Sequence, residues 1–267
     1  MTNKILFIAN WKMFGTKKTV KTINNVIKFS KRKHNKKAKI IYCPPYTLID
    51  SIVKKTKNSE IDVGAQNCHF EKNTGPFTGS ISADMIKESG AKLVIIGHSE
   101  VRMQGETNLI INKKIINALN TKLKVIFCIG ETLKEKKSNK TKLVLKKQLI
   151  LGLKYVKNLK NIIFAYEPVW SIGTGKVLDN KNLKTQFLYL KKFLKTKYKI
   201  KKPTIVYGGS VNDKNILNLK KINEIDGFLI GGASTNSKKF IDIIKKTINY
   251  KYNSCSNISC FGTYSKI

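Results

Sequence analysis

Short apolar runs recur along the chain, separated by longer polar segments. There are eight of them, rich in Ile, Val and Phe: ILFIA from Ile5, KIIYC from Lys39, IDVGA from Ile61, KLVII from Lys92, KVIFC from Lys124, IIFAY from Ile162, TIVYG from Thr204 and GFLIG from Gly227. Continuous apolar runs of this length are typical of strands that are buried on both faces of a parallel sheet. The pattern therefore predicts eight buried strands.

The segments between these runs are rich in Lys and carry an amphipathic pattern. In residues 181–194 (KNLKTQFLYLKKFL) the apolar positions follow steps of three and four, and they are Leu183, Phe187, Leu190 and Leu194. Residues at this spacing lie on one face of a helix. The pattern therefore predicts helices that pack an apolar face on the strands.

Strand and helix thus alternate eight times, which predicts an α/β fold. Alternation with short connections implies parallel strands and right-handed crossovers, and eight such units can close into a (β/α)8 barrel. An open, doubly wound sheet is the alternative that the pattern leaves open. We expect a single barrel domain over residues 1–249, followed at 250–267 by a flexible polar tail, YKYNSCSNISCFGTYSKI.

Length and apolar content fit a globular protein. The chain has 267 residues, of which 41% are hydrophobic, and no apolar run reaches the roughly 18 to 20 residues of a membrane-spanning helix. The apolar stretch near the N-terminus has only about six residues, fewer than the core of a secretory signal. We expect a soluble, cytoplasmic protein that binds no membrane.

The five cysteines favour the same compartment. They are Cys43, Cys68, Cys128, Cys255 and Cys260, an odd number with wide spacing and no C-x-x-C pair. Such spacing supports neither a disulfide framework nor a zinc site. We therefore expect free thiols and no bound metal.

The net charge of +36 would suggest a nucleic-acid partner, but its make-up argues otherwise. Of the 52 basic residues only Arg32 and Arg102 are arginines, whereas proteins that read nucleic acid favour Arg for bidentate and stacked contacts. Evenly spread Lys, with abundant Asn and Ile, is what an AT-rich genome produces. We expect no specific nucleic-acid partner, although the positive potential should attract a small anionic substrate.

Polar residues and glycines gather directly after the predicted strands. They follow the first, fourth, sixth, seventh and eighth runs, and they are Asn10, Lys12, His98, Glu100, Glu167, Ser210, Gly231 and Gly232. In a barrel the carboxyl ends of all strands meet at one rim, where active sites form. We therefore expect these residues, remote in sequence, to lie together.

Several motifs in this order resemble the triosephosphate isomerase family. They are NWKM at 10–13, QNC at 66–68, GPFTG at 75–79, GHSE at 97–100, CIGETL at 128–133, AYEPVWSIGTGK at 165–176, YGGSV at 207–211 and FLIGGAS at 228–234. The resemblance covers residues 4 to about 248. It implies a TIM barrel and a homodimer that needs no cofactor. The implied reaction interconverts dihydroxyacetone phosphate and D-glyceraldehyde 3-phosphate through an enediolate.

The resemblance also implies roles for the residues at the rim. Glu167 would be the base that moves the proton, and His98 the neutral imidazole that polarises the carbonyl, as in that family. Lys12 would supply positive charge, Asn10 would donate a hydrogen bond to the substrate, and Glu100 would hold Lys12 in place. Taken singly, these residues also fit a structural ion pair, a buried histidine or a surface lysine.

Phosphate binding is implied for a second set of residues. Backbone N–H groups can bind a phosphate only where the chain allows close approach, which the resemblance places at Gly173, Ser210, Gly231 and Gly232. It also makes residues 168–176 a lid that closes over the substrate and excludes water. The GTGK within this lid is not a nucleotide P-loop, because that motif needs Gly at 170 and Ser or Thr at 177. Cys128 is interpreted as packing, not as a nucleophile.

The chain departs from the family at three positions. Ser80 stands where the family usually has Glu, and Val101 where it usually has Arg, and those two side chains normally form a salt bridge between subunits. Since both are absent, no buried charge is left unpaired. We expect a homodimer with a weakened interface, in which the loop containing Thr78 reaches the neighbouring site. Leu178 replaces a small residue at the far lid hinge, where crowding would change the rate of lid motion.

Two other functions stay open on the sequence alone. One is a catalytically weakened barrel whose strongly basic surface binds nucleic acid or other polyanions. The other is a phosphate-binding barrel enzyme of biosynthesis, against which the lid and Glu167 argue.

Overall fold

The structure is a computed structural model, and it describes residues 4–71, 74–173 and 178–248. Its sheet has eight parallel strands: β1 Ile5–Asn10, β2 Ala38–Cys43, β3 Asp62–Ala65, β4 Leu93–Ile96, β5 Lys124–Ile129, β6 Ile162–Tyr166, β7 Ile205–Tyr207 and β8 Gly227–Ile230. Each strand pairs with the next, and β8 pairs with β1, so the sheet is a closed barrel. The predicted (β/α)8 barrel is confirmed, and the open sheet is wrong.

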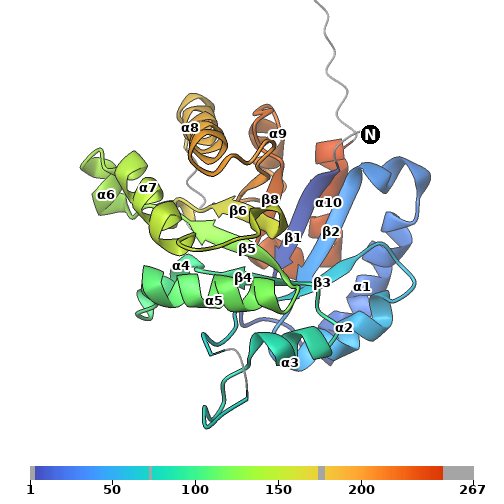
Figure 1. Ribbon diagram of the computed structural model, residues 1–267. Helices are drawn as coiled ribbons and strands as arrows, with labels where there is room; N and C mark the ends of the chain where they lie inside the picture. Colours follow the sequence, from blue (N-terminus) through green and yellow to red (C-terminus); the bar gives the residue numbers. More distant parts are fainter. Residues whose placement is uncertain (1–3, 72–73, 174–177, 249–267) are drawn as a thin grey trace, which may run out of the picture.

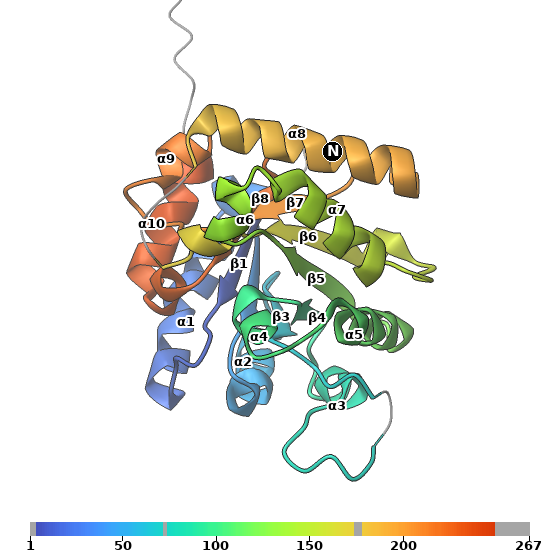
Figure 2. The ribbon, with the colours of Figure 1, turned by 90° about the vertical axis from the view of Figure 1, so that its left-hand side faces the viewer.

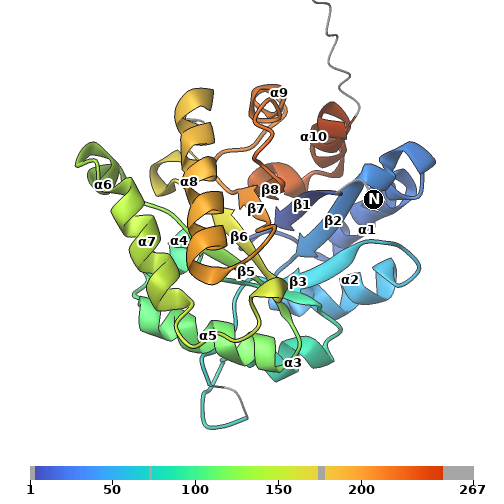
Figure 3. The ribbon, with the colours of Figure 1, turned by 45° about the horizontal axis from the view of Figure 1, so that its top comes forward.

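Helices surround the barrel, as Figures 1 and 3 show. In the described ranges the α-helices are α1 Lys17–Ser30, α2 Ile49–Thr56, α3 Ala83–Glu88, α4 Ser99–Met103, α5 Asn108–Asn120, α6 Leu133–Lys137, α7 Thr141–Gly152, α8 Asn180–Tyr198, α9 Ile216–Leu219 and α10 Ser237–Ile248. The 3-10 helices there are η1 Lys33–Lys37, η2 Tyr46–Leu48, η3 Leu159–Asn161, η4 Val169–Ser171 and η5 Gly232–Thr235. None of the described helices combines the length and apolar character that crossing a membrane requires.

Helix α8 forms as its sequence pattern predicts. Asp179 caps its first turn, since the Asp179 carboxylate accepts a hydrogen bond from the backbone N–H of Asn182 at 2.9 Å. The four predicted apolar positions are all fully buried, and they are Leu183, Phe187, Leu190 and Leu194. The helix packs this face on the barrel and exposes lysines on the other.

The core has two layers, separated by the sheet. Alternate residues of each strand point into the barrel or out toward the helices, and in β5 Ile126 and Cys128 belong to the inner cluster while Val125 and Phe127 belong to the outer one. This double burial explains why the strands read as continuous apolar runs. It also places Cys128 in packed apolar surroundings, as expected.

Two predictions fall on residues outside the described ranges. They are the polar tail at 250–267, with Cys255 and Cys260, and the part of the lid at residues 174–176. They stay predictions. The described strands and helices form one barrel from Ile5 to Ile248.

Two leucines of α8 offer a matched test of this packing. Leu190 is fully buried, whereas Leu188, two residues away, is 50% exposed. We predict that Leu190→Ala lowers the free energy of unfolding by about 2 to 5 kcal/mol, because it leaves a cavity. Leu188→Ala should cost less than about 1 kcal/mol. Urea unfolding measures both, and equal losses would contradict the assigned helix face.

Candidate functional site

The predicted site residues meet at the carboxyl-terminal rim of the barrel. A cavity of about 210 Å³ lies there, and seven of the nine predicted residues line it: Asn10, Lys12, His98, Gly173, Ser210, Gly231 and Gly232. The other two are Glu100, which reaches Lys12, and Glu167, which lies beside His98 outside the cavity lining. The rim therefore brings together residues at the ends of β1, β4, β6, β7 and β8, as a barrel requires.

Lys12 follows β1 with an unusual backbone. Its φ is 53°, the left-handed region that a residue other than glycine seldom adopts. Two hydrogen bonds hold this conformation: the Lys12 N–H donates to Asn10 Oδ1 at 3.2 Å, and Gln66 Nε2 donates to the Lys12 carbonyl at 2.8 Å. The Lys12 ammonium is 2.6 Å from Glu100 Oε1. The charge of Lys12 is thus fixed at the cavity.

His98 caps the short helix α4 and is 6% exposed. Its Nδ1 accepts a hydrogen bond from the backbone N–H of Glu100 at 3.2 Å. Since an accepting nitrogen carries no proton, the ring is neutral and its proton lies on Nε2. That Nε2 is 3.5 Å from Oε1 of Glu167. The imidazole can therefore act as a neutral donor at the cavity.

Glu167, directly after β6, is a buried carboxylate with an unused oxygen. The side chain is 2% exposed, and its Oε2 accepts a hydrogen bond from the backbone N–H of Ser99 at 3.4 Å. Oε1 has no hydrogen-bond partner within the described part of the chain. A buried polar atom without a partner costs about 1 to 3 kcal/mol, so its retention calls for an explanation. The unpaired Oε1 keeps a lone pair that can accept a proton.

Glycines make room for this carboxylate. A Cβ on Gly208, after β7, would lie 2.6 Å from Glu167 Cγ, and one on Gly130, after β5, would lie 1.8 Å from the Glu167 carbonyl oxygen. Any side chain at either position would displace Glu167. Beneath it, burial and the Glu167 carboxylate raise the pKa of the Cys128 thiol, which keeps that thiol protonated.

The opposite side of the cavity is built from short loops. Gly173 has a φ of 72°, which favours glycine. Ser171 Oγ lies 3.2 Å from the Tyr207 hydroxyl and accepts the backbone N–H of Ser210 at 3.3 Å. These contacts connect the start of the predicted lid, at Ser171, to the YGGSV loop. Gly231, in the loop after β8, lies close to the aliphatic part of the Lys12 side chain.

Glu131 is a functional candidate within the CIGETL motif that was not among the predicted site residues. It follows β5, is 1% exposed, and accepts hydrogen bonds from Trp170 Nε1 at 3.0 Å and from the Tyr166 hydroxyl at 3.2 Å. The Lys136 ammonium lies 3.5 Å from the centroid of the Trp170 ring. These contacts fix Trp170 at the entry of the predicted lid. A carboxylate two residues after the end of a buried strand was the available signal, much as the one directly after β6 was for Glu167.

Metal binding has no candidate in the described ranges, where no three His, Cys, Asp or Glu side chains are grouped to hold an ion. The cysteines described there are Cys43, Cys68 and Cys128, and all three are buried and free.

Comparisons with known proteins converge on one family. Residues 5–247 match the family model described as triosephosphate isomerase. The triosephosphate isomerase of Dictyoglomus thermophilum is 42% identical over 252 residues, covering 92% of this chain and all of that protein. That of Saccharomyces cerevisiae is 41% identical, covering 88% and 95%. The crystal structure of triosephosphate isomerase from Bartonella henselae superposes with a TM-score of 0.82 at 34% identity, covering 91% and 98%.

Glu131 generates a prediction about pH. Burial raises the pKa of the Glu131 carboxyl, so the folded state binds its proton more tightly than the unfolded chain. The resulting stabilisation is present below the unfolded pKa and is lost as pH rises through the folded pKa. Glu131→Gln should therefore gain stability relative to wild type as pH rises through that window, by at most about 1.4 kcal/mol per pH unit.

Urea unfolding from about pH 4 to pH 8 measures this difference. Glu60→Gln is a control of opposite sign, because the hydrogen bond and charge of Lys4 lower the pKa of Glu60. A difference for Glu131→Gln that falls or stays flat as pH rises would show that burial does not raise this pKa.

Proposed function

The chain belongs to the triosephosphate isomerase family, and we propose that its rim cavity performs the reaction with Glu167 as the base and His98 as the electrophile. The reaction interconverts dihydroxyacetone phosphate and D-glyceraldehyde 3-phosphate. The observation that carries the proposal is the unpaired Oε1 of Glu167, in a side chain 2% exposed and 3.5 Å from His98 Nε2.

Proton transfer would begin at the carbon next to the substrate carbonyl. Glu167 Oε1, which has no hydrogen-bond partner in the described part of the chain, takes that proton, and an enediolate forms. The carboxyl then returns a proton to the neighbouring carbon, which completes the isomerisation. Because Glu167 lies just outside the cavity lining, its side chain must rotate away from the Ser99 N–H to reach the substrate.

Charge that develops on the substrate oxygens needs donors fixed in advance. His98 would donate its Nε2–H, an assignment supported by the hydrogen bond that its Nδ1 accepts. Lys12 would supply a positive charge to the phosphate and the enediolate, and Asn10 would donate from its side-chain amide. Glu100 acts as a positioning residue, since it pairs with the Lys12 ammonium at 2.6 Å.

The substrate phosphate would bind at the glycine-rich side of the cavity. We assign its backbone donors to Gly173, Ser210, Gly231 and Gly232, which all line the cavity. A closed lid would then exclude water and protect the enediolate. The alternative of a catalytically weakened barrel that binds nucleic acid has no support in the family comparisons.

The assignment of the base predicts a large catalytic effect. Glu167→Gln keeps the shape of the side chain but cannot accept the proton, so kcat should fall by at least about 10²- to 10⁴-fold. In wild type, kcat/KM should fall as salt rises while kcat changes little, since the positive surface steers an anionic substrate.

A coupled assay of both proteins at low and physiological salt gives these values. Glu60→Gln, at an exposed position just before β3 and thus at the opposite end of the barrel, is the matched control and should retain wild-type rates. Similar rates in Glu167→Gln and wild type would exclude Glu167 as the base.

We also propose that the chain forms a homodimer. Exposed apolar side chains in the segments that follow β1, β3 and β4 support this: Met13 is 97% exposed, Phe14 59%, Phe77 40% and Met103, the last residue of α4, 79%. The segment that carries Thr78, between β3 and α3, stands out from the barrel in Figures 1 and 2. A second copy would cover these side chains. The interface would lack the family's usual salt bridge at Ser80 and Val101.

Charge substitution tests the homodimer. Met13→Asp would bury an unpaired carboxylate at the interface, which costs several kcal/mol, so we predict a monomer. Leu143→Asp on α7, where the leucine is 63% exposed, is the matched control and should leave a dimer. Sedimentation velocity at micromolar concentration distinguishes them. A dimer in both variants would exclude this surface, and a wild-type monomer would exclude the homodimer.

The cytoplasm is the compartment we propose for this enzyme. The buried free thiols of Cys43, Cys68 and Cys128 support a reducing environment.

A further inference from the structure

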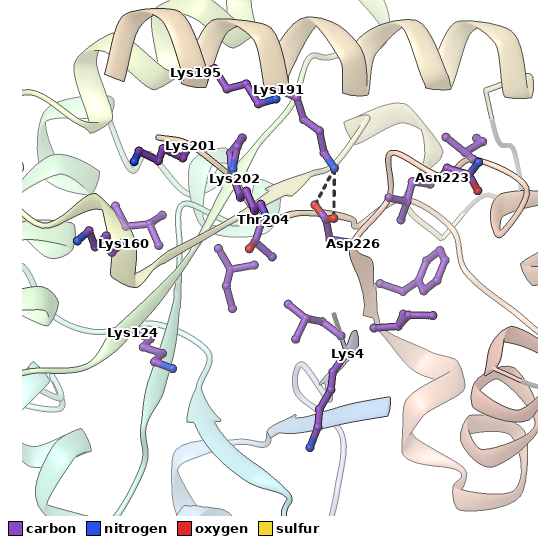
Figure 4. Close-up of a pocket in the computed structure, with 18 of the residues that line it drawn as sticks. Lys4, Lys124, Lys160, Lys191, Lys195, Lys201, Lys202, Thr204, Asn223 and Asp226 are labelled. Atoms are coloured by element: carbon purple, nitrogen blue, oxygen red, sulfur yellow. Dashed lines mark hydrogen bonds and ion pairs between the residues drawn. The ribbon is translucent and has the colours of Figure 1, made fainter. Parts of the chain in front are cut away.

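A second cavity lies at the other end of the barrel. It has a volume of about 820 Å³ and is lined by the beginnings of β1, β5 and β6 and by residues just before β7 and β8. These are the amino-terminal ends of the strands, so this cavity is remote from the rim site. Eight lysines line it, together with a single acidic residue, Asp226, over an apolar floor that includes Ile5 and Ile163. Figure 4 shows the labelled lysines around this opening.

The positive charge of this cavity is largely uncompensated. Both oxygens of Asp226 are engaged, with the Lys191 ammonium at 3.1 and 3.2 Å and the backbone N–H of Ile205 at 2.8 Å. Lys4 pairs with Glu60 at 2.6 Å. Within the described ranges five further lysines of the lining form no ion pair, and they are Lys124, Lys160, Lys195, Lys201 and Lys202.

Burial, and after it a nearby positive charge, act on Lys220, another lining residue. Burial and the nearby charge of Lys37 lower the pKa of the Lys220 ammonium. Like charges held together repel, and an anion that enters the cavity would relieve that repulsion.

A neighbouring hollow extends the basic surface. It has a volume of about 870 Å³ and shares Lys160, Lys201 and Lys202 with the first cavity, while adding Lys157 and Lys199. Figure 4 shows the three shared lysines on one side of the opening. They come from η3 and from the segment between α8 and β7. The charges are thus spread over two adjoining hollows, which together we call the lysine trough.

The side-chain types define the ligand chemistry. Lysine binds phosphate as a point charge, without the planar fork by which Arg recognises carboxylates and bases. Each hollow is within the size range of small-molecule sites, roughly 300 to 1,000 Å³. We propose that this lysine trough at the amino-terminal end of the barrel binds a small molecule carrying several consecutive phosphates. Inorganic oligophosphate and a nucleoside triphosphate share this chemistry.

Titration calorimetry with inorganic tripolyphosphate at low ionic strength tests the proposal. We expect binding to wild type, and binding at least about tenfold weaker in the triple variant Lys160→Gln, Lys201→Gln, Lys202→Gln, because exposed ion pairs are individually weak but add up. The control triple is Lys137→Gln, Lys146→Gln, Lys147→Gln, at exposed positions on α6 and α7. It removes the same charge and should weaken binding less than about twofold.

Both triple variants should keep wild-type isomerase rates, which shows that they fold. Equal loss of affinity for tripolyphosphate in the two triple variants would mean that the basic surface in general attracts the anion. That result would overturn the proposal, and so would the absence of binding to wild type. Displacement of tripolyphosphate by excess triose phosphate would show that the anion binds at the rim site, and it would overturn the proposal as well.

Two further binding measurements identify the kind of molecule that carries the phosphates. ATP that displaces tripolyphosphate and depends on the same three lysines supports the proposal with a nucleotide as ligand, and failure of ATP to bind supports it with free oligophosphate. A single-stranded oligoribonucleotide that needs these lysines and is not displaced by excess tripolyphosphate would overturn it in favour of nucleic acid.

Discussion

Pairing of β8 with β1 is the constraint on which the site depends. In that ladder Ala9 lies opposite Ile230, so Asn10 and Gly231, which follow, meet at the rim although more than two hundred residues separate them. In an open sheet these two strands would be edges. Closure also encloses the inner apolar cluster, which includes Ile8, Cys128 and Leu229, and this packed interior holds the strand ends rigidly. Rigid strand ends are what allow short polar segments to keep a fixed geometry.

The Glu167 carboxylate is a costly group for this framework to hold. It is buried, one of its oxygens has no partner in the described ranges, and the missing side chains of Gly130 and Gly208 leave the space it occupies. Stability alone would favour pairing or replacing it. Around the same rim Lys12 keeps a left-handed backbone, which is a second local cost. Such costs are typical of sites where geometry is selected for chemistry, while the two-layered core offsets them.

Much of the fold could be predicted because the strands are buried on both faces. The run at 162–166 coincides with β6, and the apolar steps in 181–194 identify the buried face of α8. Helices such as α4, α6 and α9 have only four or five residues, which is too few for the hydrophobic periodicity of a helix to be recognised in the sequence. The site residues follow the ends of predicted strands in the sequence, so their clustering at the rim could be predicted. The hydrogen bond from the Ser99 N–H to Glu167 was not, since backbone donors leave no trace in a sequence. The contact of Glu131 with Trp170 depends on the pairing of β5 with β6.

Proton transfer through Glu167 is tested most directly by isomerisation of dihydroxyacetone phosphate in D2O, followed by NMR of substrate and product at early times. A carboxyl that takes the proton and exchanges it with solvent will place deuterium at C2 of the glyceraldehyde 3-phosphate and at C1 of the recovered dihydroxyacetone phosphate. That is the result we predict for wild type. Product formed at the full rate with no deuterium at carbon would mean that the transferred hydrogen never exchanges with solvent, and it would contradict Glu167 as an exchanging base.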